Sequence, residues 1–381
     1  MLSEVYARYR FYLRQRPTIL TLFSVLAVVF FLGVTVLSRT HQGQRQAIGE
    51  RWFNRGIADL NAKRFHAAVT DFRAALLYSP DEYSYQLNLA EALIGEGRMG
   101  QASAYLINLW EREPKNGVVN LELARIAAQR GETDSAIRYY HNAVYAVWPS
   151  SQETKRLDAR LELIELLLRI GANAQAQSEL IALAENAGPD PALQERIANL
   201  FLRAGDYEHA LGAYNAALKS DRHDAAALAG AGYAAFELGR YQLAQHYLQS
   251  AVSGNPNDSE SAERLKTAQL VLHLDPFRRQ IRAAERNRIV AEAFAAAGRR
   301  LRICALPTTT ATGPARVPSL GDEWERLKPQ VTEAGLRRNP DLAEKVMDLV
   351  FRIERETNVV CGTPTGTDLA LLLISRMHEG S

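Results

Sequence analysis

The two cysteines, Cys304 and Cys361, are the side chains of this 381-residue chain best suited to covalent chemistry. They lie 57 positions apart in the C-terminal part. In an oxidising compartment they would form one disulfide, which stabilises the fold by constraining the unfolded chain. Two unrelated buried thiols are the alternative. Cys361 lies in a Gly- and Pro-rich stretch and is the one conceivable nucleophile, but no histidine close in sequence would activate it.

Other motifs give no sign of catalysis. The eight histidines include no pair three or four positions apart and none beside a cysteine, so no metal site is predicted. The stretch 362–366 has the glycines of a phosphate loop but lacks the Lys-Ser or Lys-Thr that must follow. Acid pairs such as Glu162 with Glu165 and Glu354 with Glu356 are expected to be solvated charges. We therefore expect a protein that is not an enzyme, with no catalytic residue, no cofactor, no metal and no small-molecule substrate.

The overall charge is almost balanced, with 45 Lys plus Arg against 43 Asp plus Glu. No global field favours nucleic acid, so no nucleic-acid partner is expected. Hydrophobic residues make up 47% of the chain and charged residues 23%, which is ordinary for a globular protein and excludes general disorder.

An uncharged, mostly apolar segment near the N-terminus predicts a single-pass transmembrane anchor at residues 18–38. Its core, Thr18 to Leu37, has 20 residues without a charge. As a helix it would be about 30 Å long, the thickness of a bilayer core. A cleaved signal peptide and a buried core helix are the alternatives, but the run is long for the former and its cleavage site is weak.

The flanks of this segment predict its orientation. Residues 1–17 form a basic and aromatic tail that contains Arg8, Arg10, Arg14, Arg16, Tyr6, Tyr9, Phe11 and Tyr12. Basic flanks stay in the cytoplasm. We therefore predict the inner (cytoplasmic) membrane, with the N-terminus cytoplasmic and the remaining chain periplasmic or extracytoplasmic. A disulfide would independently support that topology.

A repeat of 34 residues organises the middle of the chain. Its marker is an alanine at positions separated by 34, with one interval of 40: Ala68, Ala102, Ala136, Ala176, Ala210 and Ala244. Large or apolar residues follow four and seven positions later, the spacing of one helix face. Five positions before the alanine stands a glycine in every unit except the first, which has Lys63. Such a glycine can adopt the left-handed conformation that ends a helix, so each unit is predicted to be a helical hairpin.

This pattern resembles the tetratricopeptide repeat (TPR) family over six units: 49–82, 83–116, 117–150, 157–190, 191–224 and 225–258. The resemblance implies an all-α superhelix in which neighbouring hairpins share a core and the first helices line a groove. Residues 259–274 look like the helix that caps the last unit.

The resemblance also points to groove residues on the first helices: Phe53, Ile57, Leu87, Glu91, Arg125, Asn199 and Tyr233. The Lys and Asn pattern with which some members clamp a partner's C-terminal carboxylate is not reproduced at these positions. An amphipathic partner segment is one interpretation. The other interpretation is a shifted register, in which Phe53 and Leu87 are core residues.

Residues 277–381 are expected to form a small helical module. Helical spacing predicts an arginine-rich helix at 277–302, helices at 322–336 and 341–356, and a last one after residue 368. The Pro-containing stretch 306–320 is predicted to be a linker. If Cys304 and Cys361 pair, the module would be a disulfide-stapled helical cap.

Taken together, these features favour a membrane-anchored, bacterial-type TPR scaffold or assembly factor. It would bind protein partners, such as subunits of a membrane or envelope complex, without catalysis. A periplasmic, chaperone-like holder of newly translocated proteins is the first alternative. An enzyme with its site in the C-terminal module is the second.

Overall fold

The structure is a computed structural model that describes residues 2–148, 152–304 and 316–378, together with the side chains of 21–35, 43–148, 152–304 and 319–378. Helices account for the regular structure of these residues, apart from one isolated bridge between Asn116 and Val147. The chain divides into two compact units, residues 1–166 and 167–381, which are described separately.

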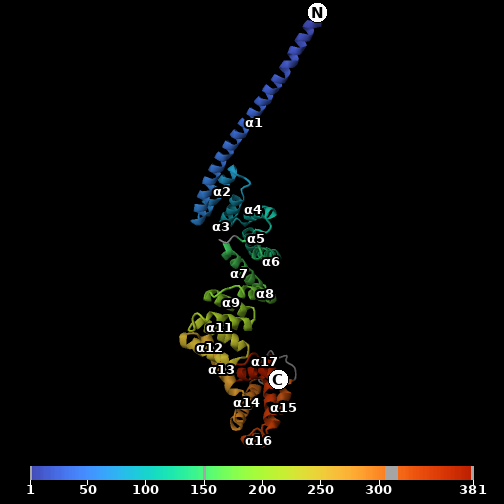
Figure 1. Ribbon diagram of the computed structural model, residues 1–381. Coiled ribbons are helices and arrows are strands. Elements are labelled where there is room, and N and C mark those ends of the chain that lie inside the picture. The colour runs from blue at the N-terminus through green and yellow to red at the C-terminus, as the bar shows by residue number, and fades with distance from the viewer. Residues whose placement is uncertain (1, 149–151, 305–315, 379–381) are drawn as a thin grey trace. The chain divides into compact units, whose positions relative to one another are not determined.

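The first unit contains helices that each pack against the next along the chain, from α1 to α6 (Figure 1). They are α1 (Leu2–Asn61), α2 (Phe65–Tyr78), α3 (Tyr83–Gly95), α4 (Met99–Arg112), α5 (Gly117–Gln129) and α6 (Thr133–Val144). Helix α7 (Glu153–Arg169) crosses the boundary between the two units.

The second unit continues the hairpins and adds the C-terminal module. Its hairpin helices are α8 (Asn173–Ala184), α9 (Pro191–Arg203), α10 (Tyr207–Ala217), α11 (Ala225–Glu237) and α12 (Tyr241–Gly254). They are followed by α13 (Ser259–Leu274), α14 (Ala283–Cys304), α15 (Arg316–Leu327), α16 (Glu333–Arg338), α17 (Asp341–Cys361) and α18 (Gly366–Met377).

Left-handed turn residues separate the two helices of each hairpin. The glycines marked by the repeat all have φ between +70° and +80°: Gly97, Gly131, Gly171, Gly205 and Gly239. In the first hairpin Lys63 takes their place with a φ of +56°. The repeat therefore keeps the same turn even where it lacks the residue that adopts it without strain.

Small residues at the helix crossings allow the hairpins to close. All six marker alanines are completely buried. At two of the small positions twelve residues earlier, a Cβ atom would lie 2.6 Å from a side chain of the second helix: Gly56 would meet Phe72, and Gly232 would meet Leu248. Larger buried residues such as Phe72 and Leu106 belong to one apolar core that is shared by the first hairpins.

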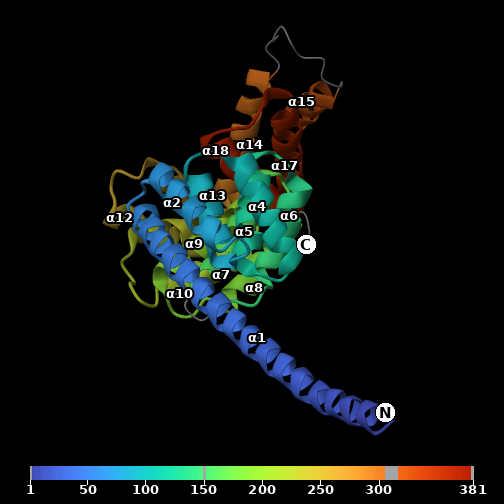
Figure 2. The same cartoon turned by 90° about the horizontal axis from the view of Figure 1, so that it is seen from above.

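The C-terminal module has its own core, which joins the last hairpin through α13. Helix α13 packs against both α12 and α18. Helix α17 packs against α14, α15 and α18 (Figure 2). Trp324 of α15 stacks on Phe294 of α14 with ring centroids 5.0 Å apart and donates a hydrogen bond of 2.9 Å to the Phe294 carbonyl. Gly298 makes this approach possible, because a Cβ atom there would lie 2.3 Å from the indole.

Four of the ranges expected for this module need correction. The arginine-rich helix begins at Ala283 rather than at residue 277, since Pro276 and the left-handed Gln280 (φ +65°) interrupt the backbone. Of the expected linker 306–320, residues 316–320 belong to α15, whose first turn accommodates Pro318 because amides there need no helical partner. Residues 305–315 lie outside the described part.

The expected helix 322–336 is two helices, because α15 ends at Leu327 and α16 starts only at Glu333. The Thr332 hydroxyl accepts a hydrogen bond of 3.0 Å from the Gly335 amide and so caps α16. Helix α17 extends beyond residue 356 to Cys361, where Gly362 with a φ of +80° ends it.

Among the residues whose placement is described, no helix is both long enough and apolar enough to cross a membrane. The expected span at 18–38 lies partly outside the described side chains, and the tail at 1–17 lies wholly outside them.

Candidate functional site

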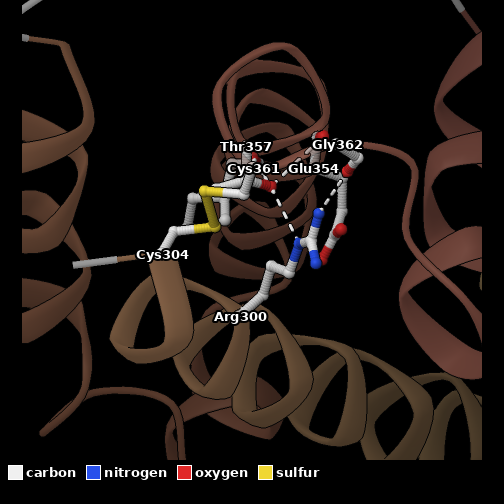
Figure 3. The surroundings of a disulfide bond; sticks show 7 residues. Arg300, Cys304, Glu354, Thr357, Cys361 and Gly362 are labelled. Carbon is white, nitrogen blue, oxygen red and sulfur yellow. Dashed lines mark hydrogen bonds between the residues drawn. A yellow bond between two sulfur atoms is a disulfide. The ribbon is translucent and has the colours of Figure 1, made fainter. Parts of the chain in front are cut away.

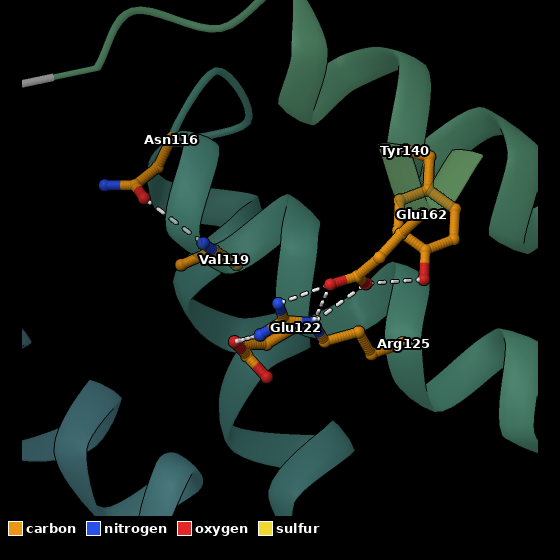
Figure 4. A network of polar contacts seen from close by, with 6 residues as sticks. All are labelled: Asn116, Val119, Glu122, Arg125, Tyr140 and Glu162. Atoms are coloured by element: carbon orange, nitrogen blue, oxygen red, sulfur yellow. Dashed lines mark hydrogen bonds and ion pairs between the residues drawn. The ribbon is translucent and has the colours of Figure 1, made fainter. Parts of the chain in front are cut away.

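A polar network centred on Arg125 links three helices of the first unit (Figure 4). The Arg125 guanidinium on α5 donates to Glu122 Oε1 at 2.7 Å. It also donates through Nη2 to Glu162 Oε1 at 2.6 Å and through Nε to Glu162 Oε2 at 3.0 Å. The Tyr140 hydroxyl on α6 donates to the same Glu162 carboxylate at 3.0 Å. Arg125 thus joins two carboxylates, and Glu162 on α7 binds both neighbouring helices.

The start of α5 fixes where this network lies. The Asn116 side-chain oxygen accepts from the amides of Val118 at 3.1 Å and Val119 at 3.2 Å, an N-cap that sets the helix register. Glu122 and Arg125 are then three residues apart on one face of the helix. The register at the N-cap therefore places both side chains on one face of α5, from which Arg125 reaches Glu162 of α7.

Burial gives the network unusual electrostatics. Loss of solvation raises the pKa of Glu122, partly offset by the nearby Arg125 guanidinium. The hydrogen bond to Glu162 is the main reason that the pKa of Arg125 is raised. Burial, followed by the Glu162 charge, raises the pKa of Tyr140, so its hydroxyl stays a donor. The charges at this site are held in place by their partners and are partly buried.

Glu91 on α3 is the member of this region with spare bonding capacity. Burial raises the pKa of its carboxyl, and the charges of Lys155 and Arg125 oppose that shift. It makes no hydrogen bond to any residue that the structure describes. A partner could therefore supply a donor to Glu91 without breaking an existing bond.

The apolar candidates of the first unit are used mainly for packing. Phe53 stacks on Tyr85 with centroids 4.7 Å apart and contacts Phe72 at 5.7 Å. Ile57 and Leu87 are also partly buried against the same core. Of the two interpretations of Phe53 and Leu87, the geometry favours packing, with only part of each side chain left at the surface.

The two candidate groove residues of the second unit, Asn199 and Tyr233, both contact neighbouring side chains. The Asn199 amide oxygen accepts a hydrogen bond of 2.8 Å from the Tyr214 hydroxyl. The guanidinium of Arg264 lies 4.3 Å from the ring centroid of Tyr233, which also makes a T-shaped contact with the ring of Tyr207. The structure thus brings Phe53, Ile57 and Leu87 to one core and places Glu91 near Arg125.

Sequence reasoning missed the partners of Arg125. Glu162 was expected to be a solvated charge, which is wrong, because Arg125 and Tyr140 bind it. Glu122 was not singled out. A signal was present in the repeat itself, since Glu122 and Glu162 occupy the same sixth position of consecutive units.

The second correction concerns Glu354, which was expected to be solvated and is completely buried. It lies beside the disulfide between Cys304 and Cys361, which is present in the structure. Across the described residues, no group of three His, Cys, Asp or Glu side chains is arranged to hold a metal ion.

Comparison with known families identifies the hairpins. One tetratricopeptide repeat model matches residues 53–117 and 196–259, and a second matches residues 93–147. The chain contains tetratricopeptide repeats. The TPR fold is in general a non-catalytic scaffold for protein interactions.

Three of the solved structures that resemble parts of this chain are as follows. Pseudomonas aeruginosa pilF is 16% identical, with 58% of this chain and 97% of that chain covered and a TM-score of 0.41. PilW, described as a type IV pilus biogenesis factor, is 15% identical over 58% and 98% of the two chains, with a TM-score of 0.40. The C-terminal part of a TPR protein from Cytophaga hutchinsonii is 12% identical over 62% and 92%, with a TM-score of 0.46. No curated protein matches the sequence.

Proposed function

We propose that the protein is a membrane-anchored scaffold or assembly factor that binds protein partners through its TPR hairpins and catalyses no reaction. The observation that carries this proposal is the series of hairpins that share the same buried alanine and the same left-handed turn. Such stacks present extended surfaces from successive first helices. Subunits of a membrane or envelope complex are the partners that fit an anchored scaffold.

The anchor is supported by the sequence and by the exposure of α1. Its described side chains between residues 21 and 34 are all exposed, including Phe23, Leu26 and Phe30. Exposed apolar side chains around a whole helix are suited to lipid rather than to water. We therefore keep residues 18–38 as the proposed membrane span.

The same helix would couple the anchor to the scaffold. Helix α1 runs without a break from Leu2 to Asn61, and its last turns form the first helix of the first hairpin. Between residues 38 and 49 a helix rises by about 16 Å. The first hairpin would therefore stand close to the membrane surface at a fixed distance, instead of on a flexible tether.

The proposed topology has the N-terminus in the cytoplasm and the repeats in the periplasm. The basic flank before the span favours this orientation. The disulfide between Cys304 and Cys361 is in keeping with an oxidising compartment.

Within the first unit, the surface around Glu91 and Arg125 is the proposed contact site. Arg125 is held by two carboxylates, so its neighbours are pre-organised before a partner arrives. Glu91 has acceptor capacity for a cationic or amide donor of the partner. The apolar side chains Phe53, Ile57 and Leu87 pack in the core, so they would contribute to the shape of this surface rather than form new hydrogen bonds with a partner.

Site-specific photocrosslinking in cells tests the proposal. A photoreactive residue would replace exposed Asn54 or Gln129 on the first helices, and exposed Ala104 on a second helix as the matched control. We expect one or a few discrete protein adducts from the first-helix sites, weakened when Glu91→Gln and Arg125→Gln are introduced together. Equal adducts from both faces, or none, would contradict the proposal. A broad smear of many clients would favour the chaperone-like alternative.

A further inference from the structure

The C-terminal module contains a seam where α14 meets α17, closed at one end by the disulfide (Figure 3). Arg300 and Cys304 are one turn apart on α14, while Glu354, Thr357 and Cys361 share one face of α17. The two cysteines are the last residues of their helices. The covalent bond therefore holds the ends of both helices together at this seam.

The disulfide lies at the surface, within reach of a reductant. Cys361 is exposed and Cys304 is partly exposed. Two apolar side chains beside them, Ile303 and Val359, are 61% and 79% exposed. Reduction of the bond therefore needs no prior unfolding of the module.

Glu354 lies behind the disulfide without a polar partner. It is completely buried, and neither carboxyl oxygen accepts or donates a hydrogen bond among the described residues. The nearby Arg300 does not neutralise it directly, because its guanidinium donates to the Gly362 carbonyl at 2.6 Å and to the Thr357 hydroxyl at 3.4 Å. A buried carboxylate without hydrogen bonds is strongly disfavoured.

The charges around Glu354 add to this effect. Asp368 on α18 faces it with a like charge, and Arg300 on α14 is the opposing cation. Arg299, also on α14, acts on Asp368. On α15, Glu323 binds Arg352 of α17 instead. Burial, then Asp368, raises the pKa of Glu354 to about 8. In the closed module the Glu354 side chain is therefore neutral at neutral pH.

We propose that this seam is a redox-controlled latch, in which reduction of the Cys304–Cys361 bond allows α14 and α17 to separate and Glu354 then releases its proton. With the disulfide intact, the ends of the helices cannot part, and Glu354 stays neutral and buried. Once the bond is reduced, opening is driven by hydration of the Glu354 carboxylate. Reduction and a rise in pH thus both favour opening of the seam between α14 and α17.

The chemistry of the first step is ordinary thiol–disulfide exchange. A dithiol supplies two electrons and two protons, the bond between the two Sγ atoms breaks, and the dithiol leaves as its own disulfide. Cys304 and Cys361 each become a thiol. In the second step the Glu354 carboxyl gives its proton to water as the seam opens.

Linkage predicts how steeply opening depends on pH. In the open state Glu354 regains an ordinary pKa of about 4.3. Between that value and the raised pKa, the closed state holds one proton that the open state releases. The ratio of open to closed seam therefore rises about tenfold per pH unit in this window and levels off above it.

Hydrogen exchange of the full-length protein in detergent micelles tests the latch. Protection of the amides at 352–361, corrected for the intrinsic effect of pH on exchange, would be measured between pH 5.5 and 7.5. The oxidised protein, the protein reduced by a phosphine, and a Cys304→Ser/Cys361→Ser variant would be compared. Glu354→Gln, which keeps the shape of the neutral acid, and Asp368→Asn, which removes the like charge, are the matched variants.

We expect the oxidised protein to stay protected with little pH dependence. In the reduced protein and in the double serine variant, protection should fall about tenfold per pH unit. In the reduced state, Glu354→Gln should abolish this dependence of protection on pH. In Asp368→Asn, protection should stop falling at a lower pH than in the unaltered protein. Equal protection in oxidised and reduced protein would overturn the role of the disulfide. An unchanged slope in Glu354→Gln would overturn the role of Glu354.

Discussion

At the scale of single residues, Lys63 shows how the repeat tolerates an exception. It is the one repeat turn position without glycine and still adopts a φ of +56°. A side chain with a Cβ atom in this conformation costs about 1 kcal/mol relative to glycine. The turn is therefore imposed on Lys63 by the packing of α1 against α2, and it should respond to substitution.

We expect Lys63→Gly to stabilise the first unit by about 1 kcal/mol, since it removes this strain. Gly97→Ala is the matched reverse change, because Gly97 has a φ of +80° and a Cβ atom there would meet nothing within 4 Å. It should destabilise the fold by about the same amount. Urea denaturation followed by circular dichroism measures both. Equal signs for the two variants would contradict this account of the turns.

The Arg125 network gives a second prediction at this scale. Glu162→Gln keeps the volume but removes the charge that Arg125 and Tyr140 bind. Because the ion pair is only partly buried, we expect a loss of about 1–2 kcal/mol in the free energy of unfolding. Glu111→Gln on the exposed face of α4 is the control and should change stability by less than about 0.5 kcal/mol. A Glu162→Gln variant as stable as that control would show that the network contributes nothing.

At the scale of helices, the buried marker alanines of the repeat determine how closely the two helices of a hairpin pack. Ala102 on α4 is completely buried, whereas Ala104 on the same helix is exposed. A larger side chain at Ala102 must displace α3 or distort its own rotamer. The small residues of the repeat are thus a geometric requirement of the helix crossing.

We expect Ala102→Leu to destabilise the first unit by about 1–3 kcal/mol. Ala104→Leu adds the same atoms to the surface of the same helix and should change stability by less than about 0.5 kcal/mol. Thermal unfolding of the two variants side by side measures the difference. Similar melting temperatures would mean that the crossing can relax around the larger residue.

At the scale of the whole molecule, the proposed anchor should decide where the protein is found. We expect full-length protein to sediment with membranes and to resist extraction at alkaline pH. A chain of residues 39–381 should remain in the supernatant while keeping its helical circular dichroism spectrum. A helix of about 20 apolar residues binds a bilayer essentially irreversibly, which is the reason for the contrast.

Replacement of residues 18–38 by an unrelated apolar span of equal length is the control, and it should restore sedimentation. Full-length protein that is released by alkaline extraction would contradict an integral anchor. A shortened chain that still sediments would place the membrane contact elsewhere in the protein.

The sequence by itself determined the features that depend on local periodicity. The 34-residue spacing of the alanines and the glycine five positions before each of them led to the helix pairs and to the capping helix at 259–274. Backbone conformation and helix faces depend on residues only a few positions apart, so a single chain shows them. Because the chain has two cysteines, an intramolecular disulfide can join only Cys304 to Cys361.

Only the tertiary structure decided which charges are buried and what they meet. Arg125 and Glu162 are 37 positions apart, and Glu354 meets Asp368 and Arg300 from two other helices. Acid residues on a helix look alike in sequence whether they face water or a neighbouring helix. Their environment is a property of long-range packing, which sets solvation and therefore the energy of each charge.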